Sequence, residues 1–400
     1  MSCINEDPAK DGIKLGEEEG VKVLETEKTP ESTRRTSKRK RSRRKKDKEL
    51  EERKKQKTQH MLKKWSAEIK QKLRDKNELK PIEDKRNEAD DEKLRWFGDQ
   101  IKHDENWPNE TRDGIIRIMS HNINGTNPKD DYTDWEMLLD NVNNLQADII
   151  CLSELNLDVN KPEVAHKMVE KAKQMDLNLK LNLATSKTTV NNTCHKRGGN
   201  AAMIRGNWAG HVKKMSRDKL GRWTSLELIG KAGRTVKIIS TYRVCEQKHN
   251  QGSCTIYMQQ QNDLVQEKRE DTDPREAILT DLSKMITEDH KNGKVVILAG
   301  DMNESTKDSK RLTEFLNSNR MYNAVEAKHL SLYPATYNRG RECLDWIAIS
   351  STVDVGAIKK SGYLPFYEGY MSDHRALYVD IDTTHLFTMA KPNTNFNNDI

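Results

Sequence analysis

The chain has 400 residues, 33% of them charged, and a formal net charge of +7. This length allows one large domain or two of ordinary size. No run of about 18 apolar residues occurs, which argues against a membrane-spanning helix, and the polar N-terminus has no apolar core of a secretory signal. We therefore expect a protein that contacts no membrane and is not secreted.

Basic charge is concentrated near the N-terminus. Residues 1–33 have few large apolar side chains, so we expect residues 1–48 to form a disordered arm. A dense run of Arg and Lys occupies residues 34–46. Such a run attracts phosphate backbones through counterion release and is typical of a nuclear-import signal. It predicts a nuclear protein, or otherwise a cytoplasmic one; the alternative is a solvated charge run without a partner. The run includes Arg34, Lys38, Arg39, Lys40, Arg41, Arg43, Arg44, Lys45 and Lys46.

Residues 49–105 are expected to form a charged helical segment or linker, since they are rich in Lys, Glu, Gln and Arg. One narrow apolar stripe has the three- and four-residue spacing of a helix. A short coiled coil, a helix packed on the next domain and a lone amphipathic helix all fit it. The stripe consists of Leu62, Trp65, Ile69 and Leu73.

From about Arg112 the pattern becomes that of a compact α/β domain, assigned to residues 106–390 with a disordered tail at 391–400. Asp134 is predicted to cap a helix, and further helices are expected at 163–176, 256–270, 275–291 and 308–317. The hairpins and crossover helices fit a layered sandwich with two mixed β-sheets packed face to face and helices outside. The expected strands lie in GIIRIMSHNING, ADIICLSELN, GGNAAMI, TSLELI, TVKIISTY, KVVILAGDMNE, CLDWIAIS and ALYVDID.

Six cysteines are scattered without a Cys-x-x-Cys pair, so we expect free thiols in a reducing compartment. Cys245, His249 and Cys254, with the adjacent Cys194 and His195, offer zinc-type ligands. Their spacing matches no zinc finger, so ordinary thiols are the favoured interpretation.

Polar side chains recur where the predicted strands end. Each alone is better explained as a turn former. If these strand ends converge, however, the carboxylates repel one another unless a cation neutralises them. Oxygen ligands favour a hard ion such as Mg²⁺, and such an ion beside an imidazole suits attack of water on a phosphate ester. The residues are Asn122, Glu154, Asp301, Asn303, Asp345, Asp373 and His374.

The ordered set HNING, LSELN, GGNAAMI, TYR, GDMN, LDWIAIS and SDH resembles the endonuclease/exonuclease/phosphatase superfamily over roughly residues 112–385. This superfamily includes pancreatic deoxyribonuclease, abasic-site endonucleases and the endonucleases of non-LTR retrotransposons. The resemblance implies an α/β protein, a four-layered α/β sandwich with the active site at one edge of the paired sheets.

The segments TYRVC, DPRE and LPFYEGYMSDHRALYVD are similar to those of endonuclease-like reading frames found with reverse transcriptases. This similarity implies a DNA endonuclease of retroelement origin, expected as a monomer. No Tyr-x-Asp-Asp box of a reverse transcriptase occurs in the chain, so any such partner would be separate.

The resemblance also implies Mg²⁺ as cofactor, with Mn²⁺ as a substitute. Glu154 would be the principal metal ligand, helped by Asn122 and Asp373. Asn124 occupies a position where abasic-site enzymes have an Asp, and this departure weakens a prediction of abasic-site specificity. Asn124 is instead predicted to contact nucleic acid, as are Arg222 and Arg243.

Catalytic roles follow from the same resemblance. Asp301 would orient or deprotonate the attacking water, and Asn303 would hold the phosphate. His374 would donate a hydrogen bond to that phosphate while Asp345 binds the far side of its imidazole. Tyr242 would contact the phosphate or the leaving group.

Two alternatives stay open. A phosphatase or deadenylase-like RNA exonuclease would have the same fold, although GDMNES and ECLDWI differ from the motifs of inositol phosphatases. The domain could also be a catalytically inactive nucleic-acid-binding module, against which the full set of chemical residues counts.

Overall fold

The computed structural model describes residues 92–101, 113–128, 131–187, 194–230, 233–246, 255–330, 332–366, 370 and 372–387. The predicted basic arm, the apolar stripe of residues 62–73, His249, Cys254 and the C-terminal tail lie outside the described residues. Within them, no helix is long and apolar enough to cross a membrane. The described cysteines, Cys151, Cys194, Cys245 and Cys343, are free thiols.

Two mixed β-sheets form the centre of the described body. One has seven strands in the order β1-β12-β13-β2-β3-β5-β4, and the other has six in the order β10-β11-β9-β8-β7-β6. The β2–β3 and β8–β9 pairs are parallel, and the other neighbours are antiparallel. The first sheet consists of β1 (Phe97–Gly98), β2 (Ile115–Asn122), β3 (Ile149–Ser153), β4 (Lys180–Ala184), β5 (Asn200–Ile204), β12 (Ile358–Tyr363) and β13 (Leu377–Asp382). The second consists of β6 (Val212–Arg217), β7 (Trp223–Ile229), β8 (Thr235–Tyr242), β9 (Val295–Asp301), β10 (Met321–Asn323) and β11 (Asp345–Ser350).

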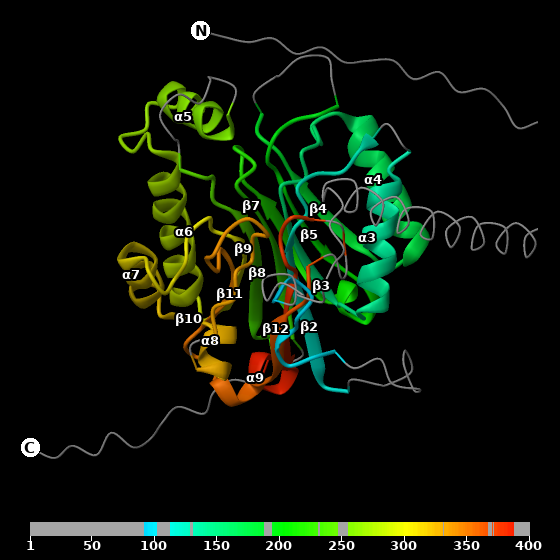
Figure 1. The fold of residues 1–400 in the computed structure, drawn as a ribbon, viewed down its shortest axis with the longest axis vertical. Helices are drawn as coiled ribbons and strands as arrows, with labels where there is room; N and C mark the ends of the chain where they lie inside the picture. The colour runs from blue at the N-terminus through cyan, green and yellow to red at the C-terminus, as the bar shows by residue number, and fades with distance from the viewer. Residues whose placement is uncertain are drawn as a thin grey trace, which may run out of the picture. The chain divides into compact units, whose positions relative to one another are not determined.

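Helices cover the outer face of each sheet. Figure 1 shows α3 and α4 on one side of the paired sheets and α6 and α7 on the other, which gives the predicted α/β sandwich. The α-helices are α3 (Thr133–Asn144), α4 (Pro162–Met175), α5 (Ile256–Gln266), α6 (Pro274–Lys291), α7 (Lys310–Ser318), α8 (Ala324–His329) and α9 (Thr383–Phe387). Two short 3₁₀ helices, η2 (Gly206–His211) and η3 (Val355–Ala357), complete the described set.

Side-chain alternation along the strands builds the layers. In β3, Ile149 packs in the core between the sheets, while Ile150 packs in the core under α3 and α4. In β9, Ile297 faces the central core and Leu298 faces α6 and α7. Because successive strand residues point to opposite faces, these continuous apolar runs are buried on both sides.

Helix boundaries differ from the prediction at α3. Asp134 is not the cap: α3 begins at Thr133, its N-cap is Tyr132 in a left-handed conformation, and no side chain caps it. Asp134 lies in the first turn, where a negative charge favours the helix dipole. The apolar face of α3, formed by Trp135, Leu138, Leu139 and Val142, is buried.

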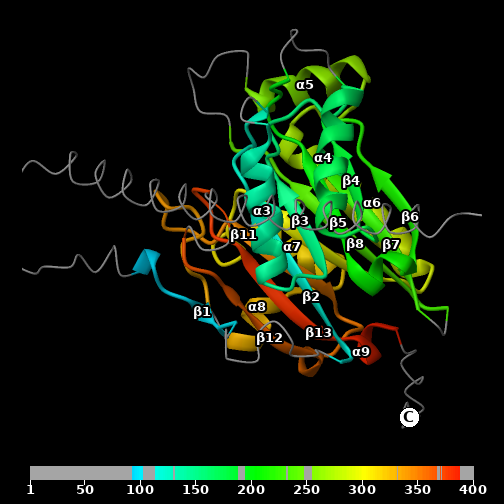
Figure 2. The same ribbon diagram turned by 90° about the vertical axis from the view of Figure 1, so that its right-hand side faces the viewer.

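The described body begins ahead of the predicted boundary at residue 106. Phe97 and Gly98 form β1, the edge strand next to β12, which Figure 2 shows at the border of the first sheet. Ile101 is also buried in the core under α3. The charged composition of residues 49–105 hid this strand, because only two residues pair.

Candidate active site

The two sheets place their strand ends side by side at one edge. In the first sheet, Asn122 at the end of β2 lies opposite Ser153 at the end of β3. In the second, Asp301 at the end of β9 pairs in register with Tyr242 on β8 and Asp345 on β11. The carboxyl ends of neighbouring parallel strands meet at one edge, so residues far apart in sequence converge here.

Asp301 forms a hydrogen bond between the two sheets at this edge. Its Oδ2 accepts a hydrogen bond from Asn122 Nδ2 at 2.8 Å, and its Oδ1 accepts one from the Asn303 backbone N–H at 2.8 Å. Asn303 Nδ2 adds a bond to Oδ2 at 3.2 Å. Burial of Asp301, with the charge of Asp345, raises the pKa of this carboxyl to about 8, although His374 opposes the shift.

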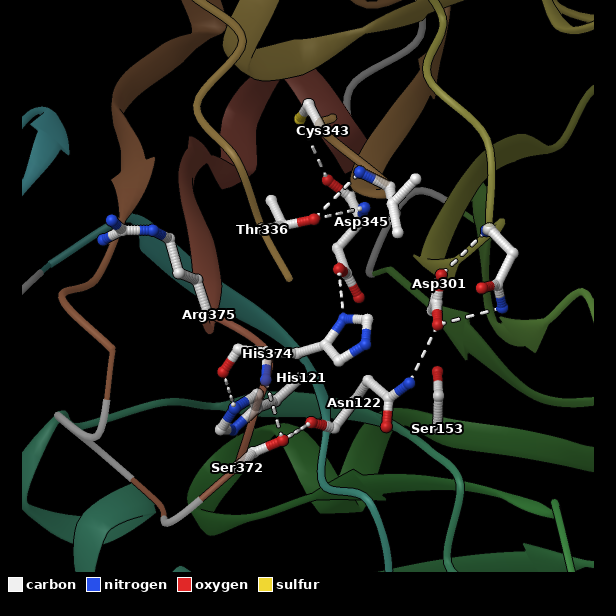
Figure 3. A network of polar contacts seen from close by, with 12 residues as sticks. His121, Asn122, Ser153, Asp301, Thr336, Cys343, Asp345, Ser372, His374 and Arg375 are labelled. Atoms are coloured by element: carbon white, nitrogen blue, oxygen red, sulfur yellow. Dashed lines mark hydrogen bonds and ion pairs between the residues drawn. The ribbon is translucent and has the colours of Figure 1, made fainter. Parts of the chain in front are cut away.

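Asp345 and His374 form a buried pair beside Asp301. Asp345 Oδ2 lies 2.7 Å from His374 Nδ1, and Figure 3 shows the imidazole below Asp345 with Asp301 to one side. Burial alone would lower the pKa of His374, but the charge and hydrogen bond of Asp345 outweigh it, and the pKa rises to about 10. The imidazole is therefore protonated at neutral pH.

The turn that carries His374 is fixed to the end of β2. Ser372 Oγ donates to the Asn122 carbonyl at 2.5 Å and accepts the His374 backbone N–H at 3.1 Å. His121 Nε2 lies 3.1 Å from the His374 carbonyl oxygen, and burial lowers the pKa of His121 to about 4, so the neutral ring donates. The sequence pattern assigned no role to Ser372 or His121. Their position beside Asn122 and His374 was the only available signal.

Glu154 follows β3 in a left-handed backbone conformation, with φ 55°. Its carboxylate shares a hydrogen bond with the Tyr242 hydroxyl, which fixes its position. Burial raises the pKa of Glu154, and the charges of Asp373 and Asp345 add to this rise. Non-glycine residues with positive φ are uncommon and often mark functional turns, and Asn303, with φ 51°, is a second one at this edge.

The donor set fits a divalent cation. Asp301 and Asp345 offer carboxylate oxygens within 4.8 Å of each other and of a His374 ring nitrogen, and the charged ring acts beside them as a hydrogen-bond donor. Asp345 Oδ1 is buried and has no hydrogen-bond partner within the described part of the chain. Burial is the main cause of the raised pKa values of Glu154 and Asp301, and neighbouring carboxylates raise both further. A hard cation held by carboxylate oxygens would relieve this repulsion.

Of the three residues predicted to contact nucleic acid, one is exposed and two are buried. Asn124 is exposed, and its backbone N–H donates to Asn122 Oδ1 at 3.0 Å. Arg243 is fully buried and bonds to Glu304. Arg222 is 3% exposed and bonds to Asp218 and Asp281. Both guanidinium groups are thus engaged with protein in this conformation.

Two hollows lie away from the strand-end cluster. One of about 630 Å³ is lined by α6 residues alone, and one of about 300 Å³ lies at the β6–β7 turn beside Arg222. Neither is lined by the carboxylates or the imidazole described above. The chemistry is therefore assigned to the strand ends and not to the larger hollow.

The fold defines a class of proteins. An AP endonuclease from Leishmania major matches with a TM-score of 0.51 at 12% identity, covering 76% of this chain and 96% of that one. Human Nocturnin's catalytic domain matches with a TM-score of 0.44 at 17% identity, covering 67% and 94%. An endonuclease/exonuclease/phosphatase family protein from Leptotrichia buccalis matches with a TM-score of 0.42 at 13% identity, covering 66% of this chain and 99% of that one. The Leishmania match and the two face-to-face mixed sheets give the chain the endonuclease/exonuclease/phosphatase fold that its motifs predict.

No family model matches the sequence, and no curated protein matches it. At identities this low the likeness establishes the fold alone. Function has to be argued from the site.

Proposed function

We propose that this protein is a divalent-cation-dependent phosphodiesterase that cleaves DNA. The observation that carries the proposal is the triad of Asp301, Asp345 and His374, held together where the two sheets meet. It combines a carboxyl group that can accept a proton, a cationic hydrogen-bond donor and the carboxylate that keeps this donor charged. Groups of these kinds promote the hydrolysis of a phosphate diester.

Asp301 is the proposed acceptor of the proton of the attacking water. A carboxyl with a raised pKa is protonated near neutral pH, so it needs a nearby cation to lower that pKa before it can act. Asn122 and Asn303 hold its two oxygens. Asn303 Nδ2 donates to Asp301 and also to the Arg243 carbonyl at 2.8 Å. Because both its amide hydrogens are engaged, we propose that Asn303 orients Asp301 rather than holding the phosphate.

His374 is the proposed donor to the scissile phosphate. Asp345 binds Nδ1, which fixes the ring and keeps it charged. In the described part of the chain no hydrogen bond to Nε2 is found, so this N–H is left for a phosphoryl oxygen. As the bond from the water oxygen to phosphorus forms and the bond to the leaving oxygen breaks, negative charge grows on the phosphoryl oxygens, and a cationic donor stabilises it.

The proposed cation is Mg²⁺, with Mn²⁺ able to replace it. Glu154 would hold it, with Asp373 at the edge of its shell and Asn122 contributing through its side-chain oxygen. When bound, such an ion polarises the phosphate and neutralises the leaving oxygen. Tyr242 would act on this site by holding the Glu154 carboxylate.

DNA is the favoured substrate because the basic run at residues 34–46 adds salt-dependent, sequence-independent affinity for a polyanion. The Leishmania major protein with a similar fold is an AP endonuclease, which accords with this choice. Retroelement origin, action with a separate reverse transcriptase and a nuclear location stay predictions from the sequence.

Nicking of supercoiled plasmid by the full-length protein tests the proposal. We expect cleavage with Mg²⁺, loss with EDTA, and a decrease of about a hundredfold or more for Asp301→Asn, His374→Ala and Glu154→Gln. Asp308→Asn and His166→Ala change exposed residues of the same types and serve as matched controls. Wild-type protein that nicks no faster than the site variants would refute the proposal.

A substrate panel separates the alternatives. Plasmid DNA, abasic duplex, poly(A) RNA and an inositol phosphate are compared under the same conditions. Preferential shortening of poly(A) would favour the deadenylase, and phosphate release from the inositol substrate would favour the phosphatase. Salt-dependent DNA binding without any cleavage would favour the inactive binding module.

A further inference from the structure

Arg375 follows the proposed catalytic His374 directly and is 1% exposed. In the described part of the chain, the hydrogen bonds of its guanidinium all go to backbone carbonyl oxygens. They are Ala335 at 2.9 Å, Leu364 at 3.0 Å, Arg95 at 2.9 Å and Glu92 at 2.6 Å. Burial lowers the pKa of Arg375 to about 10, a sign of how little compensating charge surrounds it.

Two aromatic rings complete the environment of this guanidinium. Its central carbon lies 4.1 Å from the ring centroid of Phe366 and 5.0 Å from that of Phe97. A guanidinium is planar, donates in a fixed fork and stacks on aromatic faces. The surroundings of Arg375 match these properties and would not suit a lysine ammonium.

Half of the carbonyl partners belong to the segment Glu92–Asp99, named here the strap. The strap is fixed to the first sheet by β1, by the Phe366 N–H donating to the Lys93 carbonyl at 2.8 Å, and by the Asp99 N–H donating to the Ser361 carbonyl at 2.9 Å. Trp96 also packs edge-on against Tyr378 of β13. The strap therefore comes from the N-terminal part of the chain yet reaches the turn that carries His374.

Arg375 is also connected to Asp345 by hydrogen bonds through Thr336. The Arg375 backbone N–H donates to the Thr336 carbonyl at 2.8 Å, next to Ala335. Thr336 Oγ1 in turn accepts the backbone N–H groups of Leu344 at 2.8 Å and Asp345 at 3.2 Å. Figure 3 shows the guanidinium directed away from the His374 ring, with Thr336 close to Asp345. Hydrogen bonds thus link the strap, Arg375, Thr336 and Asp345, which binds His374.

We propose that Arg375 is a positioning residue, which uses the strap to fix the turn of His374 and, through Thr336, the Asp345 that binds its imidazole. This inference rests on the proposed function for its catalytic readout only. Without the guanidinium, the strap carbonyls of Arg95 and Glu92 and the carbonyl of Ala335, next to Thr336, lose their shared donor. The turn that carries His374 is then held less rigidly. Small displacements of a reacting group cost large factors in rate.

The test compares Arg375→Lys with Arg117→Lys in the full-length protein. Arg117 is a matched control: it is also a buried arginine of the first sheet, it bonds to the Leu145 carbonyl and Asp380, and it lies 5.1 Å from the Tyr378 ring centroid. We expect both variants to lose thermal stability, because each removes buried hydrogen bonds. We expect Arg375→Lys alone to lower kcat by about tenfold or more with KM unchanged.

A spectroscopic readout is independent of the substrate. The Nδ1 proton of His374, hydrogen-bonded to Asp345, gives a low-field proton resonance in ¹⁵N-histidine-labelled protein, identified by its absence from His374→Ala. We expect the resonance to persist in Arg117→Lys and to broaden or vanish in Arg375→Lys. If Arg375→Lys keeps both kcat and the resonance, as Arg117→Lys does, Arg375 is merely structural and the inference is overturned.

A milder variant covers the case in which Arg375→Lys does not fold. Phe97→Leu keeps an apolar side chain in the strap and removes only the ring over the guanidinium, and we expect a smaller loss of kcat in the same direction. A folded Phe97→Leu with wild-type kcat and resonance would overturn the inference in that case. If His374→Ala cleaves as well as wild type, the proposed function fails, and the resonance still decides the role of Arg375.

Discussion

At the scale of single residues, environment separates side chains of one type. The His121 ring is hydrogen-bonded to the His374 carbonyl oxygen, so the two histidines are neighbours. Burial nevertheless lowers the pKa of His121 to about 4, whereas Asp345 raises that of His374 to about 10. One imidazole is thus a neutral support and the other a cationic donor. Sequence alone shows two histidines and cannot assign these charges.

Asp345→Asn should therefore change the pH dependence of cleavage. Removing the anion lowers the pKa of His374, because the charged imidazole loses its main stabilising partner. We expect the alkaline limb of the kcat/KM profile to move to lower pH, with a loss of about a hundredfold at the optimum. An unchanged alkaline limb would show that His374 is not the group that titrates.

Tyr242→Phe should weaken cation binding. The Tyr242 hydroxyl holds the Glu154 carboxylate, so its loss frees the proposed principal ligand. We expect cation affinity to fall by about 10–100-fold in isothermal titration calorimetry. Tyr322→Phe, which removes a hydroxyl bonded to the Val353 carbonyl away from the site, should bind as wild type does. Equal affinities for all three proteins would contradict a role for Tyr242.

At the scale of elements, backbone packing sets where Asp301 lies. Gly300 precedes it in β9, and a Cβ at this position would lie 1.8 Å from the Thr241 carbonyl oxygen of β8. The parallel pairing of β8 and β9 at Thr241 and Gly300 requires this close approach. Glycine is the residue that permits it.

Gly300→Ala should consequently disturb both fold and site. The added methyl group clashes with backbone, which cannot move as a side chain can, so β9 must shift and carry Asp301 with it. We expect a loss of roughly 2–4 kcal/mol in the free energy of unfolding, measured by denaturant titration, and loss of cleavage. Gly210→Ala is the control, since its Cβ would meet nothing within 4 Å. Similar stabilities for the two variants would refute the close-packing account.

At the scale of the whole molecule, two sheets bring like charges to one edge, and the stability of the protein depends on how these charges are compensated. The pKa of His374 is raised from 6.5, so its contribution is complete below pH 6.5 and is lost as pH rises through about 10. The pKa of Asp301 is raised from 3.8 to about 8, so the fold favours the protonated carboxyl and loses stability between these values.

Both shifts have the same sign, so the cation-free protein should lose thermal stability as pH rises from 6 to 10. Added Mg²⁺ should raise Tm, and more at pH 9 than at pH 6, because its carboxylate ligands must be ionised. Scanning fluorimetry with EDTA or Mg²⁺ across this range checks both. Asp301→Asn should lessen the loss between pH 6 and 8 and keep the loss between pH 8 and 10, where His374 titrates. An unchanged loss between pH 6 and 8 in that variant would show that Asp301 does not cause it.

The sequence by itself determined much of this protein. Continuous apolar runs such as residues 295–299 specify buried strands, helical spacing specifies α3, α4 and α6, and the order of motifs specifies the fold. These signals are local, so they can be read without the structure. Short edge strands such as β1 and β10 were not predicted from the sequence, because two or three residues show no detectable hydrophobic period.

Only the tertiary structure decided which polar residues act together. Arg243 follows Tyr242 in sequence, yet it is buried against Glu304, whereas Asn122 reaches Asp301 across the junction of the sheets. It also showed that Arg375 ties the strap to the turn of His374. Strand pairing, burial and long-range charge produce these relations. They depend on contacts between residues 61 to 283 positions apart, which no local pattern encodes.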